Sequence, residues 1–148
     1  MPGPEFFGKL GLFVLRDFLD PARCAQLRSE MLEAASSKGR ILAKTRKFEV
    51  DESVRRALCS NVSKSTERLV QSQLAQLKPK LEEHFQTSLT GCDDPLFLRY
   101  GPQDFYKPHR DAGRTSPAEV RKRRVSIIVF LNAAAENSTA EDCYSGGP

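Results

Sequence analysis

The 148 residues are enough for one domain with a modest core, and 39% hydrophobic with 28% charged residues is ordinary for a globular protein. This composition excludes collagen-like, coiled-coil and wholly disordered chains, and no run of eighteen apolar residues predicts a membrane-spanning helix. The net charge of +4 is uneven. Residues 96–124 hold eight basic and three acidic side chains, a net +5, which leaves −1 for the rest.

The N-terminal region is apolar over residues 10–18, and we interpret it as the first strand of the fold. It lacks the basic start and small-residue cleavage site of a signal peptide. The cysteines, at positions 24, 59, 92 and 143, match neither a zinc motif nor a dense disulfide framework. We therefore expect reduced thiols and a cytoplasmic or nuclear location.

A first helix is predicted after Asp20-Pro21, because Asp caps helices and Pro suits the first helical position. Apolar residues recur at helical spacing after it, and Ser36-Ser37-Lys38-Gly39 predicts its end. The recurring residues are Cys24, Leu27, Met31 and Ala34 or Ala35. A strand is expected over residues 41–50, and then a turn or short helix over residues 51–58.

The longest helical pattern covers residues 65–85. An apolar stripe at spacings of three and four predicts packing against a sheet. Its members are Val70, Leu74, Leu77, Leu81 and Phe85. Pro79 is expected to kink or restart this helix, because proline removes a backbone donor. His84 lies beside the stripe, and we interpret it as a surface or core histidine rather than a metal ligand.

The second part of the chain contains several apolar segments of the length and pattern typical of strands. Strands are predicted over residues 96–100, 105–111 and 125–132, and a further one is expected to start at Cys143-Tyr144. A polar loop over residues 112–124 joins the middle pair. Helices followed by strands indicate an α+β fold in which the helices brace one face of a sheet.

His109 and Asp111 are the residues that point to chemistry. Residues i and i+2 of a strand project to the same face, so these two side chains can converge while Arg110 points away. Imidazole and carboxylate suit a divalent first-row metal, and one more histidine would complete a facial triad with open positions on iron(II). A His-x-Asp triplet is common in proteins, so the surrounding residues decide how strongly it indicates a metal site.

That context resembles the prolyl 4-hydroxylase-type branch of the 2-oxoglutarate- and iron(II)-dependent dioxygenases. The resemblance lies in Leu98-Arg99-Tyr100 through Asp111, in the run from Arg123-Arg124-Val125 to Asn132, and in Tyr144-Ser145-Gly146-Gly147. It implies a partial double-stranded β-helix (jelly roll) braced by N-terminal helices. Residues 1–92 would then be the N-terminal strand and supporting helices, and residues 93–148 the first half of the dioxygenase domain.

The resemblance also implies roles for individual residues. His109 and Asp111 would be the first two iron ligands, and Tyr100 would contact 2-oxoglutarate, although a buried packing role suits that tyrosine equally. Tyr106 would line the pocket or pack. Arg114 and residues 121–124 would line the substrate entrance, or form a solvated loop. With iron(II), 2-oxoglutarate and O₂, such enzymes hydroxylate an unactivated C–H bond and release succinate and CO₂; whether ascorbate sustains turnover is open.

The sequence departs from the family pattern in one respect. The family's third ligand, a histidine, and a basic residue that anchors 2-oxoglutarate belong well downstream of the double glycine, and the sequence stops at Pro148. His84 cannot take that role by position. We therefore expect a truncated chain that is inactive by itself, with apolar surface exposed along residues 125–131 and poor solubility or loose packing.

Three functions stay open. The first is a hydroxylase of which this chain is a truncated form, acting on a protein or a small molecule. The second is a non-catalytic binding module with a weak two-ligand metal site. The third, which we rank lowest, is a nucleic-acid-directed dioxygenase, because the basic loop lacks interleaved aromatic residues for base stacking. The sequence does not indicate the oligomeric state.

Overall fold

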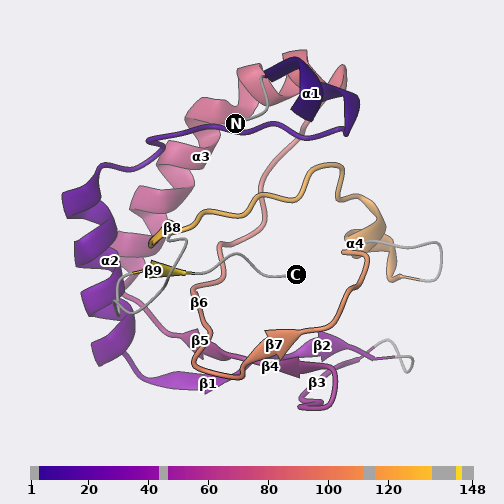
Figure 1. The fold of residues 1–148 in the computed structure, drawn as a ribbon. Coiled ribbons are helices and arrows are strands. Elements are labelled where there is room, and N and C mark those ends of the chain that lie inside the picture. The colour runs from indigo at the N-terminus through magenta and orange to yellow at the C-terminus, as the bar shows by residue number, and fades with distance from the viewer. Residues whose placement is uncertain (1–3, 44–46, 112–115, 135–142, 145–148) are drawn as a thin grey trace.

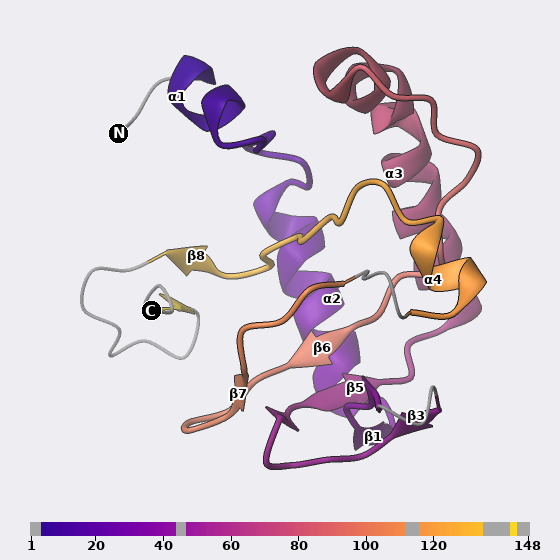
Figure 2. The ribbon, with the colours of Figure 1, turned by 90° about the vertical axis from the view of Figure 1, so that its right-hand side faces the viewer.

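The computed structural model describes residues 4–43, 47–111, 116–134 and 143–144, and over these residues the chain has a mixed α+β fold (Figure 1). Its helices are α1 (Pro4–Lys9), α2 (Pro21–Glu33), α3 (Lys64–Phe85) and α4 (Ala118–Arg121). Strands β1 to β7 gather in the part of the molecule that lies away from α1 in Figures 1 and 2. None of the helices described is long and apolar enough to cross a membrane.

The strands are short and pair mostly antiparallel. Their bounds are β1 (Ser36–Lys38), β2 (Ile41–Leu42), β3 (Phe48–Glu49), β4 (Arg55–Arg56), β5 (Leu58–Ser60), β6 (Leu98–Arg99), β7 (Phe105–Tyr106), β8 (Ala133–Ala134) and β9 (Cys143–Tyr144). β1, β5 and β6 form an antiparallel sheet in that order, while β2 pairs with β3 and β4 with β7. β8 and β9 pair in parallel, which places a strand at Cys143-Tyr144 as predicted.

Helix α2 begins where its sequence predicts. The Asp20 carboxylate accepts a hydrogen bond from the backbone N–H of Arg23 at 2.8 Å, and Pro21 follows it at the first helical position. The helix buries Leu27 and Met31 on its inner face. It ends at Glu33, and residues 36–38, predicted only as the helix end, form β1 instead.

Helix α3 confirms the longest helical prediction almost to the residue. Ser63 caps it, and it runs without interruption through Pro79 to Phe85. The predicted restart at this proline does not occur. Gln86 ends the helix in the left-handed conformation, with φ of 48°.

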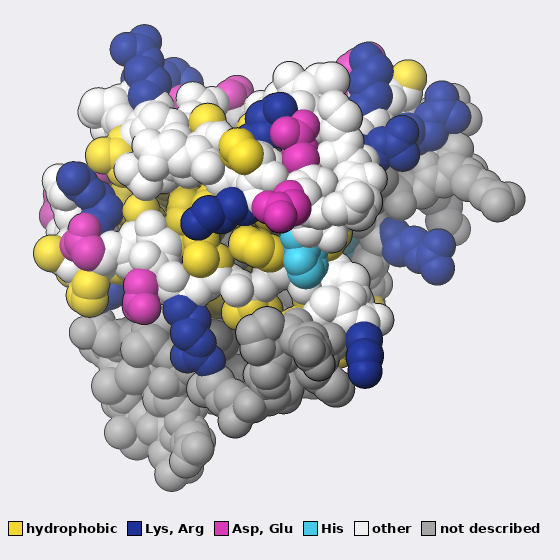
Figure 3. All heavy atoms as spheres, turned by 90° about the horizontal axis from the view of Figure 1, so that it is seen from above, with side chains coloured by type: hydrophobic (Ala, Val, Ile, Leu, Met, Phe, Trp, Pro, Cys, Tyr) yellow, Lys and Arg dark blue, Asp and Glu magenta, His cyan; other side chains and the backbone are white. Residues whose placement is uncertain are grey.

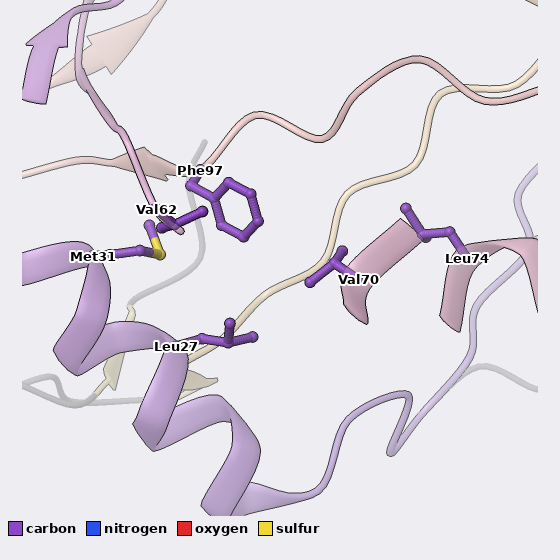
Figure 4. Close-up of a cluster of buried hydrophobic side chains, with 6 residues drawn as sticks. All are labelled: Leu27, Met31, Val62, Val70, Leu74 and Phe97. Atoms are coloured by element: carbon purple, nitrogen blue, oxygen red, sulfur yellow. The ribbon is translucent and has the colours of Figure 1, made fainter. Parts of the chain in front are cut away.

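The buried core lies between the two long helices rather than between α3 and a sheet (Figure 4). α3 contributes Val70 and Leu74, α2 contributes Leu27 and Met31, and Phe97, just before β6, completes the cluster. Its members are Leu27, Met31, Val62, Val70, Leu74 and Phe97. Val70 and Leu74 of the predicted stripe are therefore buried, although they join residues of α2 and Phe97 rather than a sheet.

Two predicted strands are wrong. Residues 10–18 follow α1 as an irregular segment in which Leu10, Leu12 and Val14 are exposed. Residues 125–132 also form no strand, and this stretch runs as coil from α4 to β8 (Figure 2). Neither stretch finds a paired strand among the described residues, and a strand is defined by its ladder rather than by side-chain pattern.

The region between residues 41 and 60 differs in detail from its prediction. Two-residue strands β2 and β3 stand where one strand was expected over residues 41–50. Asp51 then forms a turn by accepting hydrogen bonds from the N–H of Ser53 at 2.9 Å and from the hydroxyl of Ser53 at 2.6 Å. The chain continues into β4 and β5, so the alternative of a short helix over residues 51–58 is wrong.

An apolar hollow of about 380 Å³ lies between residues 11–19, the end of α3 and residues 125–130. Leu77, Leu81 and Phe85 line it from α3. Figure 3 looks onto the end of the molecule that carries α1, where hydrophobic side chains are exposed among charged ones. Segments predicted to be paired strands thus form the open wall of this hollow.

Candidate metal site

The candidate site begins where strand β7 leaves the sheet. β7 pairs with β4 in the register Arg55 opposite Tyr106 and Arg56 opposite Phe105, and the Lys107 N–H then bonds the Val54 carbonyl at 3.0 Å. The strand predicted over residues 105–111 ends there. Pro108 has no N–H with which to continue the ladder, so the chain turns away from the sheet.

His109 and Asp111 nevertheless meet, as the sequence predicts. Nε2 of His109 lies 3.1 Å from Oδ1 of Asp111. Both side chains are partly open to solvent, with 37% and 47% of their surfaces exposed. The two groups converge from an irregular turn rather than from the face of a strand.

The backbone orients the imidazole. Nδ1 of His109 lies 2.9 Å from the carbonyl oxygen of Lys107, which can only accept a hydrogen bond. A neutral ring that donates from Nδ1 directs the lone pair of Nε2 at the Asp111 carboxylate. The lone pairs of Nε2 and of the carboxylate oxygen repel each other unless a proton or a metal cation lies between them. Histidines that bind metals usually donate their other N–H to a carbonyl or a carboxylate, as Nδ1 of His109 does here.

Asp111 is held as an anion by its neighbours. The hydroxyl of Ser126 donates a hydrogen bond to its carboxylate and lowers its pKa, His109 and Arg123 lower it further, and partial burial opposes them. The sequence analysis did not identify Ser126 as a site residue. The available signal was that Ser126 is the one polar residue in the apolar run 125–131.

Tyr106 packs directly against the histidine. The two rings are stacked, with centroids 3.6 Å apart and planes 22° from parallel. Burial raises the pKa of the Tyr106 hydroxyl, the nearby Asp111 and Tyr100 raise it further, and Arg55 opposes them. Tyr106 therefore packs against a residue of the candidate site, and packing is one of the two roles predicted for it.

Tyr100 immediately follows β6 and lies close enough to influence Tyr106. It is 47% exposed, which argues against the alternative that it is a buried packing residue. The two tyrosines, His109 and Asp111 thus form one neighbourhood on the surface. An exposed phenol is free to donate a hydrogen bond to a ligand carboxylate.

The two candidate ligands suit two adjacent positions on a metal ion. Donor atoms about 2.1 Å from a metal at a right angle to each other lie about 3.0 Å apart, and the observed separation is 3.1 Å. Among the described residues, no group of three or more His, Cys, Asp or Glu side chains could hold a metal. The part of the chain that the structure describes therefore brings two potential donor atoms together, without a third donor beside them.

His84 is not that third donor. Its Nε2 lies 3.1 Å from the carbonyl of Leu12, and its ring makes edge contacts with Phe13 and Phe85 at centroid distances of 5.1 and 4.7 Å. These contacts tie residues 12–13 to the end of α3. The prediction that His84 is a structural histidine agrees with them.

Ion pairs hold part of the basic loop predicted over residues 112–124. It contains the short helix α4, and Lys122 and Arg123 form ion pairs with Glu119 at 2.9 Å and Asp93 at 2.7 Å. Arg114 lies outside the described residues. Arg123 also lies near enough to Asp111 to lower its pKa, so one end of this loop borders the candidate site.

No family model, curated protein or solved structure matches this chain. The assignment of this site therefore depends on its own residues and their geometry.

Proposed function

We propose that this chain carries two ligands of the iron(II) site of a 2-oxoglutarate-dependent dioxygenase of the prolyl 4-hydroxylase type. One observation carries the proposal: His109 Nε2 and Asp111 Oδ1 face each other at 3.1 Å while Nδ1 is held by the Lys107 carbonyl. The antiparallel pairing of β5 with β6 and of β4 with β7 is compatible with part of a jelly-roll core, which we propose as the finer fold.

The bound iron would supply hydroxylation of an unactivated C–H bond, with 2-oxoglutarate and O₂ as co-substrates. The protein's own residues orient the two ligands and shape the site. The Lys107 carbonyl fixes the proton of His109 on Nδ1, and the Ser126 hydroxyl holds the Asp111 carboxylate in place. Tyr100 is our candidate for the contact with a carboxylate of 2-oxoglutarate.

Because the described residues bring two donors together rather than three, we expect weak metal binding and no turnover unless a third donor completes the site. A binding module with a two-ligand metal site is the second candidate function. The same observations favour it, since the described residues bring two donors together and both side chains are partly open to solvent. The two functions differ in whether succinate is formed when a third donor is supplied.

Metal binding tests the shared part of both proposals. We would titrate the chain with Mn²⁺, followed by electron paramagnetic resonance, and compare His109→Ala and Asp111→Asn with the control His84→Gln. Loss of one of two ligands should weaken binding by about tenfold or more, whereas the control should leave it unchanged. Binding that survives in both site variants would refute the assignment of this pair.

Succinate formation from 2-oxoglutarate, with iron(II) and O₂, separates the two functions. We expect none from this chain alone. Succinate that appears when a segment bearing a histidine donor is added, and disappears in His109→Ala, would establish the dioxygenase. Metal binding that is lost in His109→Ala, without succinate under any of these conditions, would favour the binding module.

A further inference from the structure

A second group of side chains leads from the sheet to the candidate metal site. The guanidinium of Arg55 lies over the ring of Tyr106, 4.6 Å from its centroid, and the imidazole of His109 stacks on the same ring at 3.6 Å. Arg55 and Tyr106 are register partners in β4 and β7. The sheet thus places an arginine, a tyrosine and a proposed metal ligand in contact, one after another.

The arginine at the base of this group is fixed in place. Only 7% of Arg55 is exposed, and its Nη1 donates a hydrogen bond to the Arg40 carbonyl at 3.1 Å. Gly39 makes room for it, because a Cβ atom at that position would lie 3.0 Å from Nε and 3.3 Å from Cδ of Arg55. A buried guanidinium against a tyrosine face is a favourable contact that restricts the ring.

The opposite face of the same strand pair offers an internal comparison. There Arg56 lies over the ring of Phe105, 5.5 Å from its centroid, in the next register position. Among the described residues, no histidine ring is in contact with Phe105. The two faces therefore carry the same type of pair, but only one pair leads to the candidate site.

We propose that Tyr106, held by Arg55, is a positioning residue that fixes the plane of the His109 imidazole so that Nε2 faces Asp111. This inference depends on the proposed metal site. His109 is partly exposed and the turn that carries it is irregular, so the stack adds a second restraint on its rotamer to the hydrogen bond between Nδ1 and the Lys107 carbonyl. A ligand that must be ordered on binding gives weaker affinity than one that is already oriented.

We attribute the positioning of the imidazole to the ring of Tyr106 rather than to its hydroxyl, and the variants are chosen to separate the two. Tyr106→Phe keeps an aromatic face for both neighbours, whereas Tyr106→Leu removes it. Phe105→Leu removes the matched ring from the other face of β7 and controls for damage to the strand pair. We expect Tyr106→Leu to weaken Mn²⁺ binding by about three- to tenfold, and both Tyr106→Phe and Phe105→Leu to bind as the parent chain does.

A metal-free measurement accompanies the titration. The ring current of Tyr106 should shift the His109 Cε1–H resonance in a ¹H–¹³C spectrum, and this shift should be lost in Tyr106→Leu and kept in Tyr106→Phe. Equal Mn²⁺ affinity of Tyr106→Leu and the parent chain would overturn the positioning role while leaving the metal site intact. Equal weakening in Phe105→Leu would overturn it too, because the effect would then belong to the strand pair. If the parent chain binds no Mn²⁺, the proposed site itself fails.

Discussion

Glu30 links the two long helices through hydrogen bonds to the first turn of α3. Its carboxylate accepts from the Ser63 N–H and from the Thr66 hydroxyl, both at 2.6 Å. These bonds satisfy donors at a helix N-terminus, where the helix dipole also favours a negative charge. The hydrogen bond from Thr66, followed by that from Ser63, lowers the pKa of Glu30, while burial opposes the shift.

This lowered pKa predicts an acid-sensitive contribution to stability. Since the folded-state pKa lies below the ordinary value of 4.5, the stabilisation is fully present above that value and is lost as the pH falls through the folded-state pKa. Glu30→Gln should lower the free energy of unfolding by about 1 kcal/mol at pH 7, a figure reduced for partial solvent exposure. The difference in the free energy of unfolding between Glu30→Gln and the parent chain should shrink toward zero once the pH lies below the folded-state pKa of Glu30.

Urea unfolding at several pH values measures this difference. Glu33→Gln is the matched control, because Glu33 lies on the same helix and accepts a hydrogen bond from the Ser29 hydroxyl within α2 rather than from α3. A Glu30→Gln effect that stays constant from pH 7 to pH 3 would show that shape rather than charge matters at this position.

The sequence predicted some site residues better than others. The i, i+2 spacing placed His109 beside Asp111 even though the strand that was supposed to carry them ends at Tyr106. A turn at Pro108 happens to preserve the convergence. Arg55 and Ser126 were not predicted, because each reaches the site through pairing or packing across fifteen or more residues of sequence.

At the scale of elements, the helices were predictable because their signals are local. Asp20 and Ser63 cap the helices that follow them, and the apolar spacing of α3 agrees with its buried face. The strands have two or three residues each, and their pairing partners are distant in sequence. Residues 125–131 are rich in β-branched side chains, yet they form no strand among the described residues, because β-propensity acts only where a neighbouring strand is present.

The cap of α2 gives a prediction at this scale. Asp20→Ala removes the acceptor of the Arg23 N–H and should lower the free energy of unfolding by about 1 kcal/mol. Asp20→Asn keeps an acceptor oxygen and should cost only a few tenths of a kcal/mol. Thermal and urea unfolding of both variants measure the difference. An equal loss in both would show that the negative charge at the helix N-terminus, rather than the hydrogen bond, stabilises α2.

At the scale of the whole molecule, apolar side chains remain on the surface around one hollow. Leu12 and Leu15 on one wall and Ile127 and Ile128 on the other are at least 41% exposed. The exposure predicted for residues 125–131 is therefore observed. Contiguous apolar surface of this kind promotes association, because burying it against another apolar surface is favourable.

We therefore predict concentration-dependent self-association through this surface. Ile128, which is 76% exposed, is its most exposed large apolar residue, and Ile128→Lys should weaken self-association by about tenfold, the equivalent of about 1.4 kcal/mol of lost burial. Leu32→Lys is the matched control: Leu32 is 66% exposed on α2 and does not line the hollow. Sedimentation velocity over a concentration series makes the comparison. If Leu32→Lys reduces association as much as Ile128→Lys, added charge rather than this surface governs it, and the exposed run at residues 125–130 has no special part in assembly.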